Sequence, residues 1–129
     1  MTLYRIHGDE TGGTRLTEID LSKFQNDPTM GTRVEGLLGV PATTVSLASM
    51  VERQTDDELH AAPWRQFLIM LQGEHEIIAT SGERCTLVAG DLLFTDDVGT
   101  TGHYSRDCGE DHMVMVSVRV PDDWTFPEV

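Results

Sequence analysis

Between Phe67 and Phe94 short apolar runs alternate with glycine turns. The runs FLIML, EIIA and DLLF are rich in β-branched or large apolar residues, and Gly73, Gly82 and Gly90 separate them. Short apolar runs bounded by glycine turns predict β-strands. Many such strands at regular spacing predict an all-β sandwich or barrel.

The rest of the chain fits the same interpretation, because helical periodicity is weak throughout. The predicted strands cover residues 14–19, 33–38, 43–51, 66–71, 74–80, 84–88, 91–94, 102–106 and 112–120. The strand 43–51 has no strongly polar face, so we expect the barrel interior on one side and a partner subunit on the other. A chain of 129 residues without a linker or a repeat predicts one domain over residues 1–129.

Composition argues against two kinds of partner. The formal charge is −13, from 22 acidic and 9 basic residues, and such a surface repels phosphate, so we expect no nucleic-acid partner. No apolar run approaches the roughly 18 residues that cross a bilayer. The first residues also lack the apolar segment of a signal peptide, so we expect a cytoplasmic protein with no membrane partner.

Two smaller groups of residues are interpreted as ordinary. Acidic pairs such as Asp96-Asp97 are typical of a solvated surface that keeps a protein in solution. Cys85 and Cys108 have no metal-binding or disulfide spacing, so we expect free thiols that are buried or half-buried.

Three segments carry a resemblance to a known family: QFLIMLQGE from Gln66, AGDLLF ending at Phe94, and GHYSR from Gly102. Together they are similar to the two half-motifs of the cupin superfamily, specifically small single-domain bacterial cupins, over a motif-bearing core of about 43–120. The resemblance implies an all-β double-stranded β-helix, or jelly-roll, barrel. It also implies a homodimer and a small organic molecule held inside the barrel.

The resemblance further implies one divalent transition metal. Cupins usually take two histidines and a glutamate from the first motif and one histidine from the second, a donor set that suits zinc, iron, nickel or manganese. His60 stands at the first position and His103 at the last, while Ala62 and Gln66 replace the other two. The motif is therefore degenerate, and we expect His60, His103 and His75 to hold the metal.

Strand alternation orders the residues around these histidines. If His103 faces the interior, Ser105 does so too and Tyr104 does not. His112 is the alternative to His75 as the third ligand, and the sequence leaves open which of the two faces the cavity.

The run Pro63-Trp64-Arg65-Gln66 offers further contacts for a substrate. We expect Trp64 to close the cavity mouth, and Arg65 or Gln66 to hydrogen-bond a carboxylate or carbonyl. Ser105 joins Trp64 and Arg65 as a substrate-binding residue. The alternative is that Trp64 packs on the barrel rim while Arg65 lies in solvent beside an acidic neighbour.

Three functions follow, from different classes. The expected one is a metal-dependent enzyme that acts on a small organic molecule, with His60, His103 and Gln66 as catalytic residues; isomerisation, cyclisation, elimination and oxygenation are all compatible. The second is a metal-free enzyme in which His60 or His103 is the general acid–base and Gln66 stabilises an oxyanion. The third is a non-catalytic binding or sensor module that keeps the cavity.

Overall fold

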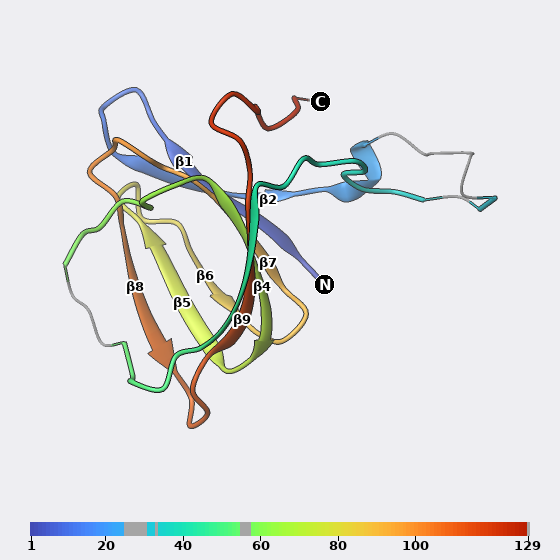
Figure 1. Ribbon diagram of the computed structural model, residues 1–129. Helices are drawn as coiled ribbons and strands as arrows, with labels where there is room; N and C mark the ends of the chain where they lie inside the picture. The colour runs from blue at the N-terminus through green and yellow to red at the C-terminus, as the bar shows by residue number, and fades with distance from the viewer. Residues whose placement is uncertain (25–30, 33, 55–57, 129) are drawn as a thin grey trace.

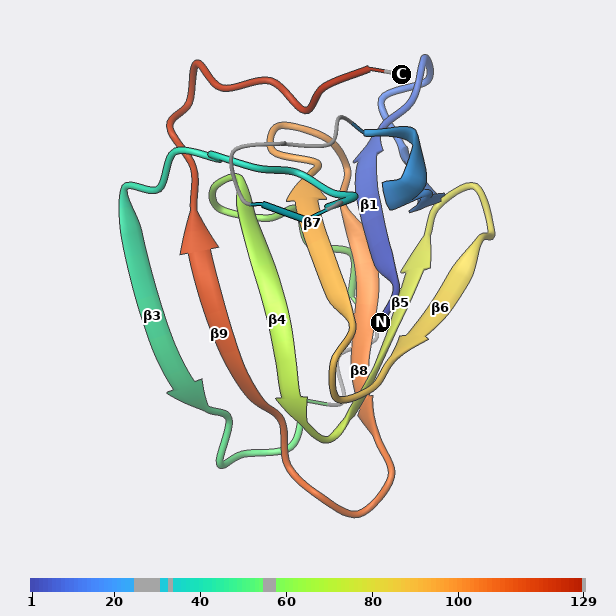
Figure 2. The same cartoon turned by 90° about the vertical axis from the view of Figure 1, so that its right-hand side faces the viewer.

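The structure is a computed structural model that describes residues 1–24, 31–32, 34–54 and 58–128. Two β-sheets face each other (Figures 1 and 2). Their strands are β1 (Leu3–Gly8), β2 (Thr14–Ile19), β3 (Thr44–Ser49), β4 (Gln66–Gln72), β5 (Glu74–Ala79), β6 (Arg84–Leu87), β7 (Leu92–Asp96), β8 (His103–Cys108) and β9 (Val114–Arg119). The 3₁₀ turn η1 (Leu21–Lys23) follows β2. No helix in the described part of the chain is long and apolar enough to cross a membrane.

The larger sheet has the strand order β2-β1-β7-β4-β9-β3, and the smaller sheet has the order β6-β5-β8. Neighbouring strands pair antiparallel except β1 and β7, which run parallel. The predicted all-β class is confirmed, and the fold is a two-sheet sandwich.

Most strands predicted from the sequence are confirmed. The strand 14–19 has the predicted bounds, and seven others differ by no more than two residues at either end. The strand predicted at 33–38 is wrong over residues 34–38, and residue 33 lies outside the described residues. In that segment Leu37 packs on the outer face of the larger sheet, so its apolar residues cover a sheet and do not pair in one. Strand β1 was not predicted.

The core lies between the two sheets. Ile6, Met70 and Leu93 of the larger sheet meet Ile77 and Leu87 of the smaller one, and all five are at most 1% exposed. Burying one such side chain contributes about 1.5–3 kcal/mol, so this layer holds the sheets face to face.

A second apolar cluster covers the outer face of the larger sheet. Phe67 and Phe94 of this face pack against Trp124 and Phe126 of the C-terminal tail. Strands β4 and β7 are therefore covered on both faces, which explains their nearly continuous apolar sequences.

Asp96 links the C-terminal tail to the larger sheet through ion pairs with two arginines. Its carboxylate pairs with Arg5 at 2.6 Å and with Arg65 at 2.7 Å, and Arg65 also donates to the carbonyl of Trp124. The prediction that Asp96-Asp97 belongs to a solvated surface is wrong, because Asp96 is ion-paired and Asp97 is 0% exposed.

The two edges of the larger sheet differ. At the β2 edge, the Leu16 amide donates to the Glu83 carboxylate at 3.1 Å, and the Thr14 carbonyl accepts from the Ser81 amide at 3.2 Å. At the other edge, β3 is exposed along most of its length, so the expected cover on both of its faces is absent among the described residues. The partner subunit predicted on this strand stays a prediction.

The two cysteines are free thiols, as predicted, with Cys85 buried and Cys108 half-buried. Burial raises the pKa of the Cys85 thiol to about 12, and the nearby carboxylates of Asp91 and Glu76 act in the same direction. Thiolate is the reactive form, so Cys85 is inert in the folded protein.

We expect a thiol reagent such as Ellman's reagent to modify Cys108 in the native protein and Cys85 only after denaturation. The Cys108→Ser variant should lose the native-state reaction and keep the reaction seen in denaturant. Rapid modification of native Cys108→Ser would show that Cys85 is accessible.

Candidate functional site

Strand β8 places three polar side chains on the inner face of the smaller sheet. His103, Ser105 and Asp107 are 4%, 3% and 7% exposed, whereas Tyr104 between them is 36% exposed. The predicted alternation, with His103 and Ser105 inside and Tyr104 outside, is confirmed.

His75 joins this face from the neighbouring strand. It lies opposite Asp107 in the register of β5 and β8, and its Nδ1 stands 2.9 Å from the Asp107 carboxylate. Since a carboxylate accepts, Nδ1 carries the proton and Nε2 keeps its lone pair. Both side chains are buried, so His75 is a fixed, oriented imidazole.

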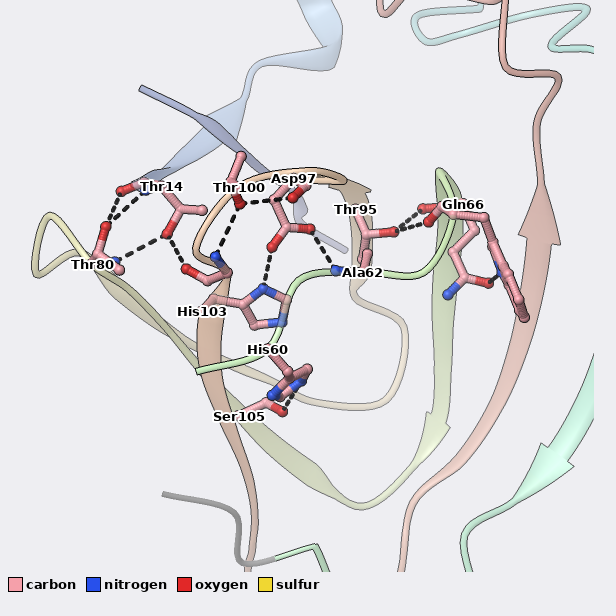
Figure 3. A network of polar contacts seen from close by, with 12 residues as sticks. Thr14, His60, Ala62, Gln66, Thr80, Thr95, Asp97, Thr100, His103 and Ser105 are labelled. Atoms are coloured by element: carbon pink, nitrogen blue, oxygen red, sulfur yellow. Dashed lines mark hydrogen bonds and ion pairs between the residues drawn. The ribbon is translucent and has the colours of Figure 1, made fainter. Parts of the chain in front are cut away.

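His103 is held in the same way by Asp97, at 2.6 Å between Nδ1 and Oδ2 (Figure 3). The other oxygen of Asp97 accepts from the Ala62 amide at 3.3 Å, and its backbone carbonyl accepts from the Thr100 hydroxyl at 2.7 Å. The loop between β7 and β8 therefore presents a buried carboxylate to Nδ1 of His103, and Nε2 keeps its lone pair.

His60 reaches the site from outside the regular strands. Its backbone pairs with that of His103 through two hydrogen bonds of 3.1 and 3.0 Å, and the two rings lie 4.8 Å apart between centroids. Nδ1 of His60 faces the carbonyl of Glu58 at 3.4 Å, and Nε2 faces the Ser105 hydroxyl at 3.1 Å. A carbonyl accepts only, so this contact puts the proton on Nδ1 and makes Ser105 the donor to Nε2.

Glycine at position 102 makes the approach of the His60 segment possible. Gly102 has φ +91°, and a Cβ built on it would stand 2.2 Å from the carbonyl carbon of His60. Only glycine admits backbone at that distance, so the pairing of His60 with His103 depends on this residue.

The histidines influence one another electrostatically. Burial lowers the pKa of His75 most strongly, the hydrogen bond and charge of Asp107 raise it, and positive charge on His103 or His60 lowers it again. Since its pKa lies below the ordinary value of 6.5, His75 is neutral at physiological pH.

Trp64, Gln66 and Arg65 lie apart from the histidines. The Trp64 indole donates to the side-chain oxygen of Gln66 at 2.9 Å, and the Arg119 guanidinium lies 4.9 Å above the indole ring. Figure 3 shows Gln66 beyond Thr95, away from His60 and His103.

Arg65 points to the outer face of the sheet, where it binds Asp96, and His112 is exposed. Of the predicted site residues, the structure thus brings together His60, His75, His103 and Ser105. The substrate contacts predicted for Trp64, Arg65 and Gln66 stay predictions.

The metal expected from the resemblance would need ligands from the three histidines. Three imidazoles are a suitable donor set for zinc or iron in kind. Within the described ranges, however, no group of three or more His, Cys, Asp or Glu side chains is placed to hold a metal ion. Nε2 of His60 is instead engaged by Ser105. The residues as placed do not fit a metal centre, and the set His60, His103 and His75 stays a prediction.

Asp97 and Asp107 are the site residues that sequence reasoning missed. Asp107 lies four residues after His103 on the same strand face, so strand alternation contained the signal. Asp97 lies at the start of the DVGTTGH segment, where two glycines mark a compact loop that returns to the histidine.

The chain was compared with known proteins, and it matches no protein-family model, no curated protein and no solved structure.

We predict that Gly102→Ala is far more damaging than Gly99→Ala. Both glycines have positive φ, so each alanine meets backbone strain of about 1 kcal/mol. Only residue 102 would also collide with the His60 backbone, since nothing lies within 4 Å of a Cβ at Gly99. Urea denaturation should show a loss of about 1 kcal/mol for Gly99→Ala and a severalfold larger loss for Gly102→Ala. Equal losses would contradict the close approach.

The lowered pKa of His75 predicts acid sensitivity. Below about pH 6.5 the unfolded chain protonates this residue while the folded chain resists it, so the free energy of unfolding falls as the pH falls. The contribution is at most about 1.4 kcal/mol per pH unit, the slope of one proton. His75→Gln keeps a donor for Asp107 and should flatten this dependence in urea titrations between about pH 5 and 8. The exposed control His112→Gln should not, and an unchanged slope in His75→Gln would refute the assignment.

Proposed function

We propose that the chain adopts the cupin-type jelly roll that its motifs resemble. In support, the chain crosses from one sheet to the other between β4 and β5, β6 and β7, β7 and β8, and β8 and β9. Repeated crossing of this kind is what winding two strands into a double-stranded β-helix requires. The three segments that carry the resemblance lie on β4, β7 and β8, which carry or flank the histidine cluster.

We further propose that the cluster transfers protons to and from a small organic molecule, without a metal. The observation that carries this proposal is the buried pair of His103 and Asp97, 2.6 Å apart. A carboxylate on Nδ1 fixes the tautomer, orients the ring and stabilises the imidazolium that forms when Nε2 takes a proton. His103 is the general base, and Asp97 is its positioning residue.

His60 completes an acid–base pair. Its ring lies beside that of His103, and its Nε2 is linked to the Ser105 hydroxyl. His103 takes a proton from the substrate on Nε2. His60 enters this step as the imidazolium, with protons on both ring nitrogens, and returns its Nε2 proton at a second atom, directly or through Ser105. A proton returned to another atom of the substrate completes an isomerisation, and a proton returned to a departing hydroxyl group completes an elimination that releases water. These are the two reaction classes that we favour.

The charged groups around the histidines limit the kinds of substrate that the site can bind. No lysine or arginine in the described ranges forms a hydrogen bond or ion pair with His75, His103, Asp97 or Asp107. Two carboxylates are buried among the histidines, and the whole chain carries −13. A phosphorylated or polycarboxylate substrate would meet unfavourable charge, so we propose a neutral or cationic carbonyl compound.

A metal-dependent enzyme is the second candidate, and one observation favours it. The imidazoles of His75 and His103 each donate Nδ1–H to a buried carboxylate, which is the usual way in which proteins orient metal-binding histidines. Small movements of these side chains and of His60 would be required before three nitrogens met at one ion.

The acid–base proposal predicts hydrogen exchange at carbon. Small neutral hydroxyketones and aldoses, incubated with the protein in D₂O, should gain deuterium next to the carbonyl, as measured by proton NMR. His103→Gln should lower the rate by about 10²–10⁴-fold, the usual contribution of a general base. Asp97→Asn should lower it as well, while Tyr104→Phe, on the outer face of β8, should match the wild type. Phosphorylated counterparts should exchange no faster than in buffer.

Two further measurements decide between the candidates. Long-range proton–nitrogen NMR should find His103 with its proton on Nδ1 at neutral pH, and a proton on Nε2 would contradict the base assignment. Dialysis of untagged protein against Zn²⁺ or Co²⁺ should leave no stoichiometric metal. One equivalent, lost in both His75→Gln and His103→Gln, would establish the metal-dependent candidate instead. Substrate analogues that raise the melting temperature without exchange would indicate a binding module.

A further inference from the structure

The outer face of the larger sheet is apolar as far as its last strand. The register aligns Leu92 of β7, Ile69 of β4, Val116 of β9 and Leu47 of β3 in one row across the sheet. A second row aligns Phe94, Phe67, Val118 and Val45. Residues directly opposite in a ladder share a face, so Val45 and Leu47 extend the surface that Phe67 and Phe94 begin.

Among the described residues, the segments that cover this face stop short of β3. Leu37, Val40, Trp124 and Phe126 pack on the part formed by β1, β7, β4 and β9. A groove of ≈ 330 Å³ remains beside Ile69 and Val118. Beyond it, Val45 is 60% exposed and Leu47 is 81% exposed.

Strand β3 also ends the sheet with an open edge. It pairs with β9 on one side, and no strand of the described residues pairs with it on the other (Figure 2). Its sequence, TVSLAS, has no proline and no charge, and each of its residues pairs in turn with one of β9, without a bulge. Natural edge strands are usually blocked by lysine, proline or a bulge, so an uncharged, regular edge is a surface suited to strand addition.

The distribution of charged residues indicates which partner the β3 edge can bind. The chain carries −13, yet no charged residue occurs between Glu35 and Glu52, and β3 lies inside that interval. Two copies of so acidic a protein repel each other over most of their surfaces. The β3 edge is a place where their backbones approach without opposing like charges.

We propose that β3 is the contact between two copies of this chain, paired antiparallel across a two-fold axis. The larger sheets then continue into each other, and the outward amide and carbonyl groups of each β3 satisfy those of the other. Val45 and Leu47 of one copy lie beside the same residues of its partner on one face. An antiparallel strand pair is self-complementary, so the contact closes at a dimer.

Sedimentation velocity over a concentration series tests the contact. The wild type should shift from monomer to dimer, and added salt should strengthen the dimer because it screens the repulsion of the acidic surfaces. Leu47→Glu should remain a monomer, since like charges would face each other across the axis. Val98→Glu adds the same charge at an exposed loop residue away from β3 and should dimerise as the wild type does.

A mixture of two oppositely charged variants tests the contact more specifically than either variant alone. Leu47→Glu and Leu47→Lys should each be monomeric, and their equimolar mixture should form a heterodimer. Both variants should keep the wild-type circular dichroism spectrum, because the side chain is exposed in the monomer. A wild type that stays monomeric at all concentrations and salt levels overturns the proposal. So does a Leu47→Glu variant that dimerises as strongly as Val98→Glu.

Discussion

Two backbone hydrogen bonds between His60 and His103 are the contact on which the site depends. They attach the segment before β4 to the free side of β8, and they exist because Gly102 leaves room for that segment. The same attachment brings the Ala62 amide to Asp97 and the His60 ring to Ser105. A single close backbone approach thus assembles a polar cluster from two segments that are distant in the sequence, residues 60–62 and 97–105, without a regular strand at residue 60.

The strands were predictable because apolar alternation and glycine turns are local signals. Alternation also correctly placed His103 and Ser105 inside and Tyr104 outside. Asp97 and Asp107 were not predicted, because an acidic residue is solvated in most proteins and only a folded partner justifies its burial. The segment 34–38 was misassigned because a chain that covers a sheet and a chain that joins one have similar apolar content. Gln66 was expected to orient a substrate, but its contact with Trp64 depends on tertiary packing that no local pattern contains.

The fold places a carboxylate that holds the structure together and a carboxylate that orients a histidine on opposite sides of the larger sheet. Asp96 and Asp97 are adjacent, yet alternation sends one carboxylate to each side of the larger sheet. Asp96 binds Arg5 and Arg65 on the outer face, whereas Asp97 binds His103 in the interior. Arg5 and Arg65 are thereby kept on the side that holds the C-terminal tail, and the interior keeps imidazoles that buried carboxylates orient. The chemistry that we propose follows from this division.

The unequal edges of the larger sheet have a consequence for how far such a sheet grows. At β2 part of the edge is already occupied, because the Leu16 amide donates to Glu83 and the Thr14 carbonyl accepts from Ser81. A chain with two open edges would add copies at both ends and polymerise into a fibre. The turn before β6 occupies part of the β2 edge, so within the larger sheet β3 is the less obstructed edge for strand addition. A symmetric pair of β3 strands leaves neither copy with an open β3 edge.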